Sequence, residues 1–187
     1  MKQISKYKIL ILALNLMLFA CTKEVNFNQI NDLQITPAIE SSLIFFDEPA
    51  NRFLDNGNEV LITQDFIIID FFENEFIVDN LVKTDLVFET ENSINRRFDL
   101  QVDFFDKSQQ LQHSFTLKQE ASTNNNEITS KFIEVFEDGT LDALKNTSVI
   151  VFTLRLFPGN PPINQTTPGR IKLKSKVVFY FNIIDPI

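Results

Sequence analysis

Two segments near the middle of the chain alternate strictly between apolar and polar residues. In the first, Phe98, Leu100, Val102 and Phe104 alternate with Arg97, Asp99, Gln101 and Asp103; in the second, Leu111, His113, Phe115 and Leu117 alternate with Gln112, Ser114, Thr116 and Lys118. Successive side chains of a strand point to opposite faces of the sheet, so this period of two predicts strands with one buried face. The polar run 106–110 between them completes a predicted β-hairpin.

The same pattern, less strictly kept, predicts further strands along the chain. They are expected at 33–36, 43–46, 59–63, 65–72, 84–90, 128–136, 149–157 and 170–184. The segment 65–72 is so apolar that we expect both of its faces to be covered. In the last strand one face is shared by six apolar residues, namely Ile171, Leu173, Val177, Phe179, Phe181 and Ile183.

Turn signals separate these strands at short intervals. Asn56-Gly57 suits the positive backbone angles of a tight hairpin turn. Thr140 is expected to cap a short helical turn that ends at Asn146, because its hydroxyl can accept a bond from a free amide. Apart from the segment 33–36, which lies in the predicted tether, about seven to nine strands with one short helical turn predict an all-β fold, an antiparallel β-sandwich.

Phenylalanine dominates the aromatic residues, with 20 Phe against two Tyr and no Trp. Its ring carries apolar area without a polar handle, whereas binding surfaces favour Trp and Tyr. We therefore expect most of these rings to fill the core of the domain.

The start of the chain has the layout of a signal peptide. Lys2, Lys6 and Lys8 open it, and an apolar run follows over 9–19. This run is shorter than the roughly 20 residues that a membrane-spanning helix needs. The sequence therefore predicts a cleaved export signal over residues 1–20.

The run ends in Leu18-Phe19-Ala20-Cys21, which resembles the lipobox of bacterial lipoproteins. The resemblance implies that Cys21 is lipidated and becomes the first residue of the mature chain. Two or three acyl chains, at about 0.8 kcal/mol per buried methylene, would anchor it stably on the membrane. Cys21 is the only cysteine, which excludes an intramolecular disulfide. The alternative is an ordinary secretory signal followed by a free cysteine.

These patterns divide the chain into a signal peptide (1–20), a lipidated N-terminus and flexible tether (21–40) and a β-sandwich domain (41–187). Of 17 basic and 25 acidic residues, residues 1–20 hold three lysines and no acid, leaving 14 against 25. A mature net charge of −11 disfavours nucleic-acid binding, which needs a basic face.

The sequence predicts no catalytic residue, metal-ligand set or cofactor. His113 is the only histidine, and its parity places it at the core margin in a structural role. Serine-elbow and phosphate-loop motifs are absent from the sequence. Three groups of acids are expected to be solvated faces, with calcium binding as the lesser alternative: Asp70, Glu73 and Glu75; Asp99, Asp103 and Asp106; Glu134, Glu137 and Asp138.

Two further features are candidates for binding a partner. Lys172, Lys174 and Lys176 form a basic stripe on the last strand, which is otherwise simply the wet face of that strand. The proline-rich loop 158–168 is the better candidate, since long loops on a rigid scaffold often carry function. Its alternative is a plain connector.

In its amino-acid composition, which is rich in Asn, Ile and Phe, the chain resembles the small envelope lipoproteins of Bacteroidota. The resemblance implies an outer-membrane location, on the periplasmic or cell-surface face, with the membrane as one partner through the lipid on Cys21. Our first hypothesis is a non-catalytic accessory module that binds a protein of an envelope complex. The alternative is a binding protein for an apolar or polymeric ligand in a Phe-lined cavity, and an envelope hydrolase is the least favoured. A packed interior with an exposed apolar edge would favour the first hypothesis, and a large Phe-lined pocket the second.

Overall fold

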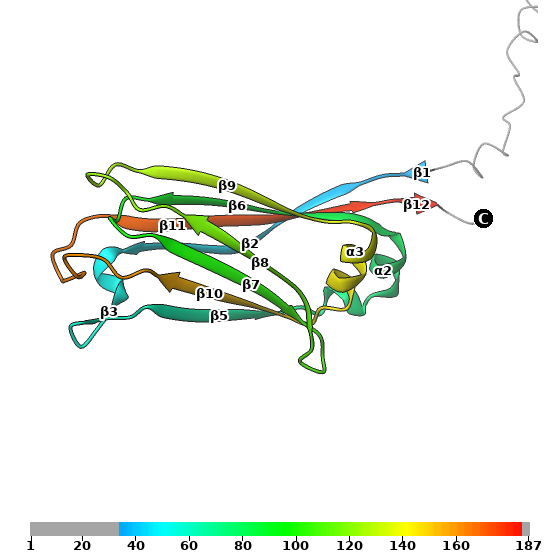
Figure 1. Ribbon diagram of the computed structural model, residues 1–187. Helices are drawn as coiled ribbons and strands as arrows, with labels where there is room; N and C mark the ends of the chain where they lie inside the picture. The colour runs from blue at the N-terminus through cyan, green and yellow to red at the C-terminus, as the bar shows by residue number, and fades with distance from the viewer. Residues whose placement is uncertain (1–33, 185–187) are drawn as a thin grey trace, which may run out of the picture. The chain divides into compact units, whose positions relative to one another are not determined.

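A computed structural model describes residues 34–184 (Figure 1). The predicted signal peptide, Cys21 and most of the predicted tether therefore lie outside the described residues. The sandwich lies within one unit, Ile35–Ile183.

Two four-stranded antiparallel sheets face one another in this unit (Figure 1). Their strands are β2 (Ala38–Pro49), β5 (Ile62–Ile68), β6 (Leu81–Asn92), β7 (Phe98–Phe105), β8 (Leu111–Gln119), β9 (Ile128–Phe136), β10 (Val149–Leu156) and β11 (Arg170–Phe181). One sheet has the order β5-β10-β7-β8 and the other β2-β11-β6-β9. Counted along the chain, the orders are second-seventh-fourth-fifth and first-eighth-third-sixth, the arrangement of an eight-stranded jelly roll. The predicted antiparallel β-sandwich is confirmed.

Short elements occupy the ends and connections. They are β1 (Gln34–Ile35), β3 (Leu54–Asp55), β4 (Asn58–Glu59), β12 (Ile183–Ile184), the 3-10 turns η2 (Ala50–Phe53) and η3 (Phe71–Glu73), and the helices α2 (Glu75–Asn80) and α3 (Asp138–Lys145). β3 pairs with β4 across Asn56 and Gly57, whose φ angles are 51° and 83°. The predicted hairpin turn at Asn56-Gly57 is therefore confirmed.

The sequence predicts helix α3 in part and does not predict helix α2. In α3 the N-cap is Glu137, and Thr140 lies one turn further in, where its Oγ1 accepts a bond of 3.0 Å from the Glu137 amide. The Thr140 hydroxyl thus accepts a bond from the N-cap amide while lying in the first turn of the helix. It is not itself the N-cap residue that we predicted. Helix α2 was not predicted. Asn74 caps it by accepting a 3.0 Å bond from the Phe76 amide.

The core lies between the sheets and is built from the inward positions of the strands. Phe88, Phe104 and Phe136 are fully buried there, and a smaller cluster around Phe53 and Phe98 fills the end beside η2. Of the phenylalanines in the described range, the exposed ones are Phe45, Phe66 and Phe76. The expectation that most aromatic rings fill the core is confirmed.

One strand expectation is wrong. β5 ends at Ile68 and not at residue 72, and its faces are not both covered, because Phe66 is 60% and Ile68 75% exposed. The reason is topological, since β5 is an edge strand whose one neighbour is β10. Smaller differences are that β2 begins at residue 38, before the expected domain start at 41, and that the expected strand 59–63 is divided between β4 and β5.

A small polar cluster on β6 and β11 shifts the pKa of Tyr180, which can be tested by titration. Its hydroxyl donates to Asp85 Oδ2 at 3.0 Å, and Lys83 Nζ lies 3.1 Å from Asp85 Oδ1. This hydrogen bond, and secondarily burial, raise the pKa of Tyr180, because both favour the protonated phenol. The stabilisation it contributes is complete below the ordinary phenol pKa and is lost as pH rises through the raised value.

We expect the pKa of Tyr180 to fall toward its ordinary value in an Asp85→Asn variant. Ultraviolet absorbance of the phenolate during a pH titration measures it, in a chain carrying Tyr7→Phe so that Tyr180 is the only phenol. Equal titration midpoints with and without Asp85→Asn would show that the carboxylate does not cause the shift.

Candidate functional site

Several sequence-predicted residues are used to hold the sandwich together. His113 Nε2 lies 2.6 Å from Glu134 Oε1, and because these residues belong to β8 and β9, the pair links the two sheets along one side. The imidazole ring also contacts the rings of Phe104 and Phe136. His113 therefore lies at the core margin, where the alternation placed it.

The acidic groups do not form a metal cradle. Asp99 pairs with Arg97 at 2.9 Å, and Asp106 accepts bonds from the backbone amides of Ser108 and Gln110 in its own loop. Within residues 34–184 no three side chains of His, Cys, Asp or Glu come together in a way that could hold a metal ion. Glu73 of the first group and Asp106 of the second line one pocket, which is described below.

The lysine stripe is largely neutralised by neighbouring strands. Lys172 Nζ lies 2.6 Å from Glu91 Oε2, and Lys176 Nζ lies 2.9 Å from Glu40 Oε2. The hydrogen bond with Glu91 raises the pKa of Lys172. β11 is an inner strand, so these lysines do not guard an edge.

The loop 158–168 is held against the sandwich. Ile163 is buried, and its amide donates to Glu59 Oε1 at 2.7 Å. Arg96, only 6% exposed, lies 3.6 Å from the same carboxylate and donates to the carbonyl oxygen of Pro161. These contacts fit a connector, and binding by this loop stays a prediction.

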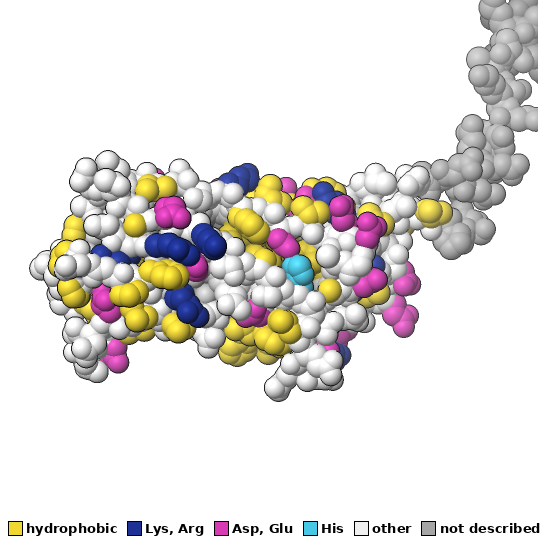
Figure 2. All heavy atoms as spheres, viewed as in Figure 1, with side chains coloured by type: hydrophobic (Ala, Val, Ile, Leu, Met, Phe, Trp, Pro, Cys, Tyr) yellow, Lys and Arg dark blue, Asp and Glu magenta, His cyan; other side chains and the backbone are white. Residues whose placement is uncertain are grey.

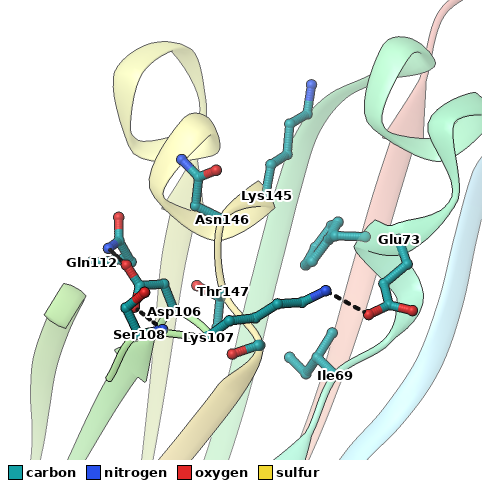
Figure 3. Close-up of a pocket in the computed structure, with 11 residues that line it drawn as sticks. Ile69, Glu73, Asp106, Lys107, Ser108, Gln112, Lys145, Asn146 and Thr147 are labelled. Atoms are coloured by element: carbon teal, nitrogen blue, oxygen red, sulfur yellow. Dashed lines mark hydrogen bonds and ion pairs between the residues drawn. The ribbon is translucent and has the colours of Figure 1, made fainter. Parts of the chain in front are cut away.

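A polar pocket of about 640 Å³ lies at the end of the sandwich that carries the helices (Figure 3). Segments 69–73, 106–112 and 145–148 line it. Lys107 and Glu73 point toward one another across it, with Nζ 2.8 Å from Oε1, and this contact lowers the pKa of Glu73. The pocket carries two lysines and two acids, so it suits a polar, uncharged ligand better than an ion.

A second concavity opens between the edge strands β2 and β5, with a volume of about 470 Å³. We call it the edge groove. Its floor includes core side chains of Phe53, Phe152 and Leu154, and Phe45 and Phe46 of β2 form part of its wall. The edge groove therefore brings apolar residues of the core and polar residues of the two edge strands, such as Glu48 and Asp65, into one lining.

The outer surface of the sheet containing β5 carries an apolar patch. Cross-strand pairing aligns Ile68 with Val149, Val149 with Phe105, and Phe105 with Leu111, one residue from each strand. Phe66 and Val151 add a second cross-strand pair. We call these six residues the apolar face. Ile68, Phe66 and Leu111 are 75%, 60% and 56% exposed, and the other three are half-buried.

The space-filling view shows how the apolar face lies on the molecule (Figure 2). Hydrophobic side chains gather near the middle of the lower edge of this side, over β5 and β10, and a group of Lys and Arg side chains lies to their left. An exposed apolar row that crosses a whole sheet is unusual for a soluble domain and commonly marks a binding surface.

The sequence did contain a signal for this surface. Residues 53–82 hold seven acids and no lysine or arginine, and within them Ile62, Phe66 and Ile68 share one face of β5. The apolar run was interpreted as a covered strand, so its exposed residues were missed.

No protein-family model matches the chain, and no curated protein matches it significantly. Among solved structures, it is similar to a protein of Parabacteroides distasonis described as secreted, with 11% identity and a TM-score of 0.46 over 63% of this chain and 37% of that one. It is also similar to VP2 of infectious bursal disease virus, with 6% identity and a TM-score of 0.41 over 78% of this chain and 32% of that one. The chain thus spans about a third of the length of each. The assignment of the jelly roll rests on the strand order itself.

Proposed function

We propose that this protein is an envelope lipoprotein, anchored to the outer membrane through Cys21, whose jelly roll is a non-catalytic module that binds a protein partner. The observation that carries the proposal is the apolar face, a row of apolar residues across all four strands of one sheet that is exposed at both ends, at Ile68 and Leu111. Burial of apolar area is the main driving force of protein association. An acidic domain gains nothing from exposing such a row in the absence of a partner.

The anchor half of the proposal rests on the lipobox sequence. Within residues 34–184 no helix is long and apolar enough to cross a membrane. Acyl chains on Cys21 would supply the attachment, because two or more chains anchor a protein stably where one chain binds only marginally.

We expect a Cys21→Ala variant to disappear from the outer-membrane fraction. Thr22→Ala is the matched control and should fractionate as the parent does. Immunoblotting of membranes separated on a density gradient measures both. A Cys21→Ala chain that stays in the outer membrane at the parental level would exclude lipidation as the anchor.

Substitutions in the apolar face should release the partner. Membranes are extracted in mild detergent from cells with a tagged full-length chain, and the proteins recovered at stoichiometric yield are quantified by mass spectrometry. Replacing Phe66 and Ile68 by Asn should lower recovery of the partner at least about tenfold, since a few residues near the centre of an interface carry most of its binding free energy, at about 2 kcal/mol or more each.

Ile133→Asn is the matched control, because Ile133 is 48% exposed on β9, in the other sheet. Its partner recovery should equal that of the parent chain. Equal loss in both variants, or recovery of the tagged chain alone from the parent, would contradict the proposal.

The edge groove favours a second candidate function, the binding of an apolar ligand. Its volume of about 470 Å³ and its four phenylalanines, Phe45, Phe46, Phe53 and Phe152, suit an acyl chain. Titration with a fluorescent fatty acid tests it. Saturable one-to-one binding that is lost in Phe45→Arg would support this function, and a lack of saturable binding would exclude it.

A further inference from the structure

The edge strand β5 differs from the other three edge strands of the sandwich. Exposed edges invite pairing with other chains, and proteins usually block them with lysine, proline or a bulge. β2 has Pro49 and a register shift opposite Lys174 and Lys176, β8 has Lys118 and a register shift, and β9 has Lys131. β5 has no lysine, arginine or proline, and its pairing with β10 runs without a shift; its one charged residue is Asp65, opposite the buried Phe152.

The backbone of β5 offers free hydrogen-bonding groups along this edge. The amide of Ile69 donates to Ser148 O at 2.8 Å, which shows that the backbone N–H and C=O groups of odd-numbered residues point toward β10. The backbone N–H and C=O groups of the even-numbered residues from Ile62 to Ile68 therefore point away from β10, toward the open edge. The amide of Phe66, one of these, donates to Asp65 Oδ1 at 2.8 Å, so a carboxylate occupies the position that a neighbouring strand's carbonyl would take.

Both sides of this edge are apolar. On the inner side lies the edge groove, with Phe152 and Leu154 on its floor, and on the outer side lie Phe66 and Ile68 of the apolar face. A strand paired to β5 would direct alternate side chains into the edge groove and alongside the apolar face. It would thus cover the partly buried Leu154 and close the edge groove over the buried ring of Phe152.

The charge around this edge selects its occupant. Residues 53–82, which include β5 and both flanking segments, hold seven acids and no basic residue, and the basic side chains beside this edge include Arg52 in the edge groove and Arg155 opposite Ile62. A second copy of the chain would bring seven more acids to the same place, and like charges across an interface oppose association. A segment that carries lysine or arginine is complementary.

We propose that β5 accepts an added strand from the envelope partner, an extended segment with apolar residues at alternate positions and basic residues at its ends. The inference rests on the proposed function and names the chemistry of its partner. On pairing, a carbonyl of the added strand replaces Asp65 Oδ1 at the Phe66 amide, and the released carboxylate pairs with a basic side chain. This is β-strand addition, in which backbone bonds give affinity and alternate side chains give specificity.

The test selects ligands from a displayed library of random twelve-residue peptides on the full-length protein in detergent. Selected peptides should alternate apolar residues and carry lysine or arginine at their ends. Their affinity should fall at least about tenfold in a Gln64→Pro variant, because proline removes a free-edge donor and its ring obstructs pairing, while sparing the bonds to β10.

Gln64→Val is the matched control, since both variants lose the bond from Gln64 Nε2 to Thr153 Oγ1 and only one changes the backbone. Gln64→Val should bind the peptides as the parent does. If Gln64→Pro fails to fold, N-methylation of the selected peptide replaces it. Methylating the peptide amides that point toward β5 should abolish binding. Methylating the alternate amides, which point away from β5, should not.

The outcomes separate this inference from the proposed function. Peptides that bind Gln64→Pro as tightly as the parent, peptides with acidic ends, or an empty selection would overturn strand addition. A parent dimer in analytical ultracentrifugation that Gln64→Pro dissociates would assign the edge to a second copy and also overturn it. If partner recovery is lost with the Phe66 and Ile68 variant but kept with Gln64→Pro, the proposed function stands and strand addition fails.

Discussion

Replacing Phe104 by Ala should lower the free energy of unfolding by about 3–5 kcal/mol. Phe104 is fully buried at the centre of the sandwich, and its ring contacts the rings of Phe115, Phe136 and His113. Deleting it leaves a cavity where β7 and β8 of one sheet meet β9 of the other. Urea denaturation followed by far-ultraviolet circular dichroism measures the change.

Phe45→Ala is the control, because this ring is 64% exposed on β2. Its effect should stay below about 1 kcal/mol, as most of its area is in water in the folded state. A loss at Phe104 no greater than the loss at Phe45 would show that the two sheets do not pack on this ring.

Replacing Arg96 by Ala should cost about 3 kcal/mol, although this residue lies in a connection and not in a strand. Its guanidinium donates to the carbonyls of Asn95 and Pro161 and lies 3.6 Å from Glu59. Its removal leaves a largely buried carboxylate without its cation, and frees the loop 158–168 from the sandwich. Denaturation measures the stability loss, and limited proteolysis should detect new cleavage within 158–168.

Arg155→Ala provides the comparison for Arg96. Arg155 is exposed on the outer surface of β10, where its loss should change stability by no more than about 0.5 kcal/mol. If the two arginine variants unfold at the same urea concentration and resist protease equally, Arg96 does not organise this end of the sandwich.

Strands whose inner face meets the other sheet could be predicted from alternation. The hairpin from Phe98 to Leu117 and the shared face of Ile171, Leu173 and Val177 are both present, because burial on one side imposes a period of two on the residues. Leu111 is the exception: the register shift opposite Phe104 and Phe105 places it beside Phe105 on the outer face, where it is 56% exposed. The turn at Asn56-Gly57 was equally accessible, since positive φ at two successive positions restricts the residue types.

β5 and α2 could not be predicted in the same way. An apolar run indicates only that a segment avoids water, and whether the sandwich or another molecule covers it depends on strand order, which local sequence does not fix. In α2, Phe76, Ile77 and Val78 favour extended structure locally. The cap from Asn74 and packing against the core stabilise the helix instead.

The candidate site follows the same division. Cys21 can be predicted from a local pattern because a processing enzyme recognises a short contiguous sequence. Its lipidation stays a prediction. The apolar face is assembled from β5, β7, β8 and β10, which are distant in sequence. Leu111 and Ile68 share a row only because two intervening strands lie between them in register.

The most direct test of the apolar face is photo-crosslinking at single positions in intact cells. A photoreactive phenylalanine analogue replaces Phe66, Ile68 or Leu111 in the full-length chain, and Ile133 serves as the control position. We predict one crosslinked protein, the same from all three positions of the apolar face and absent from Ile133. Crosslinks of equal yield at Ile133, or none at Phe66, Ile68 and Leu111, would contradict the claim that this face binds a partner.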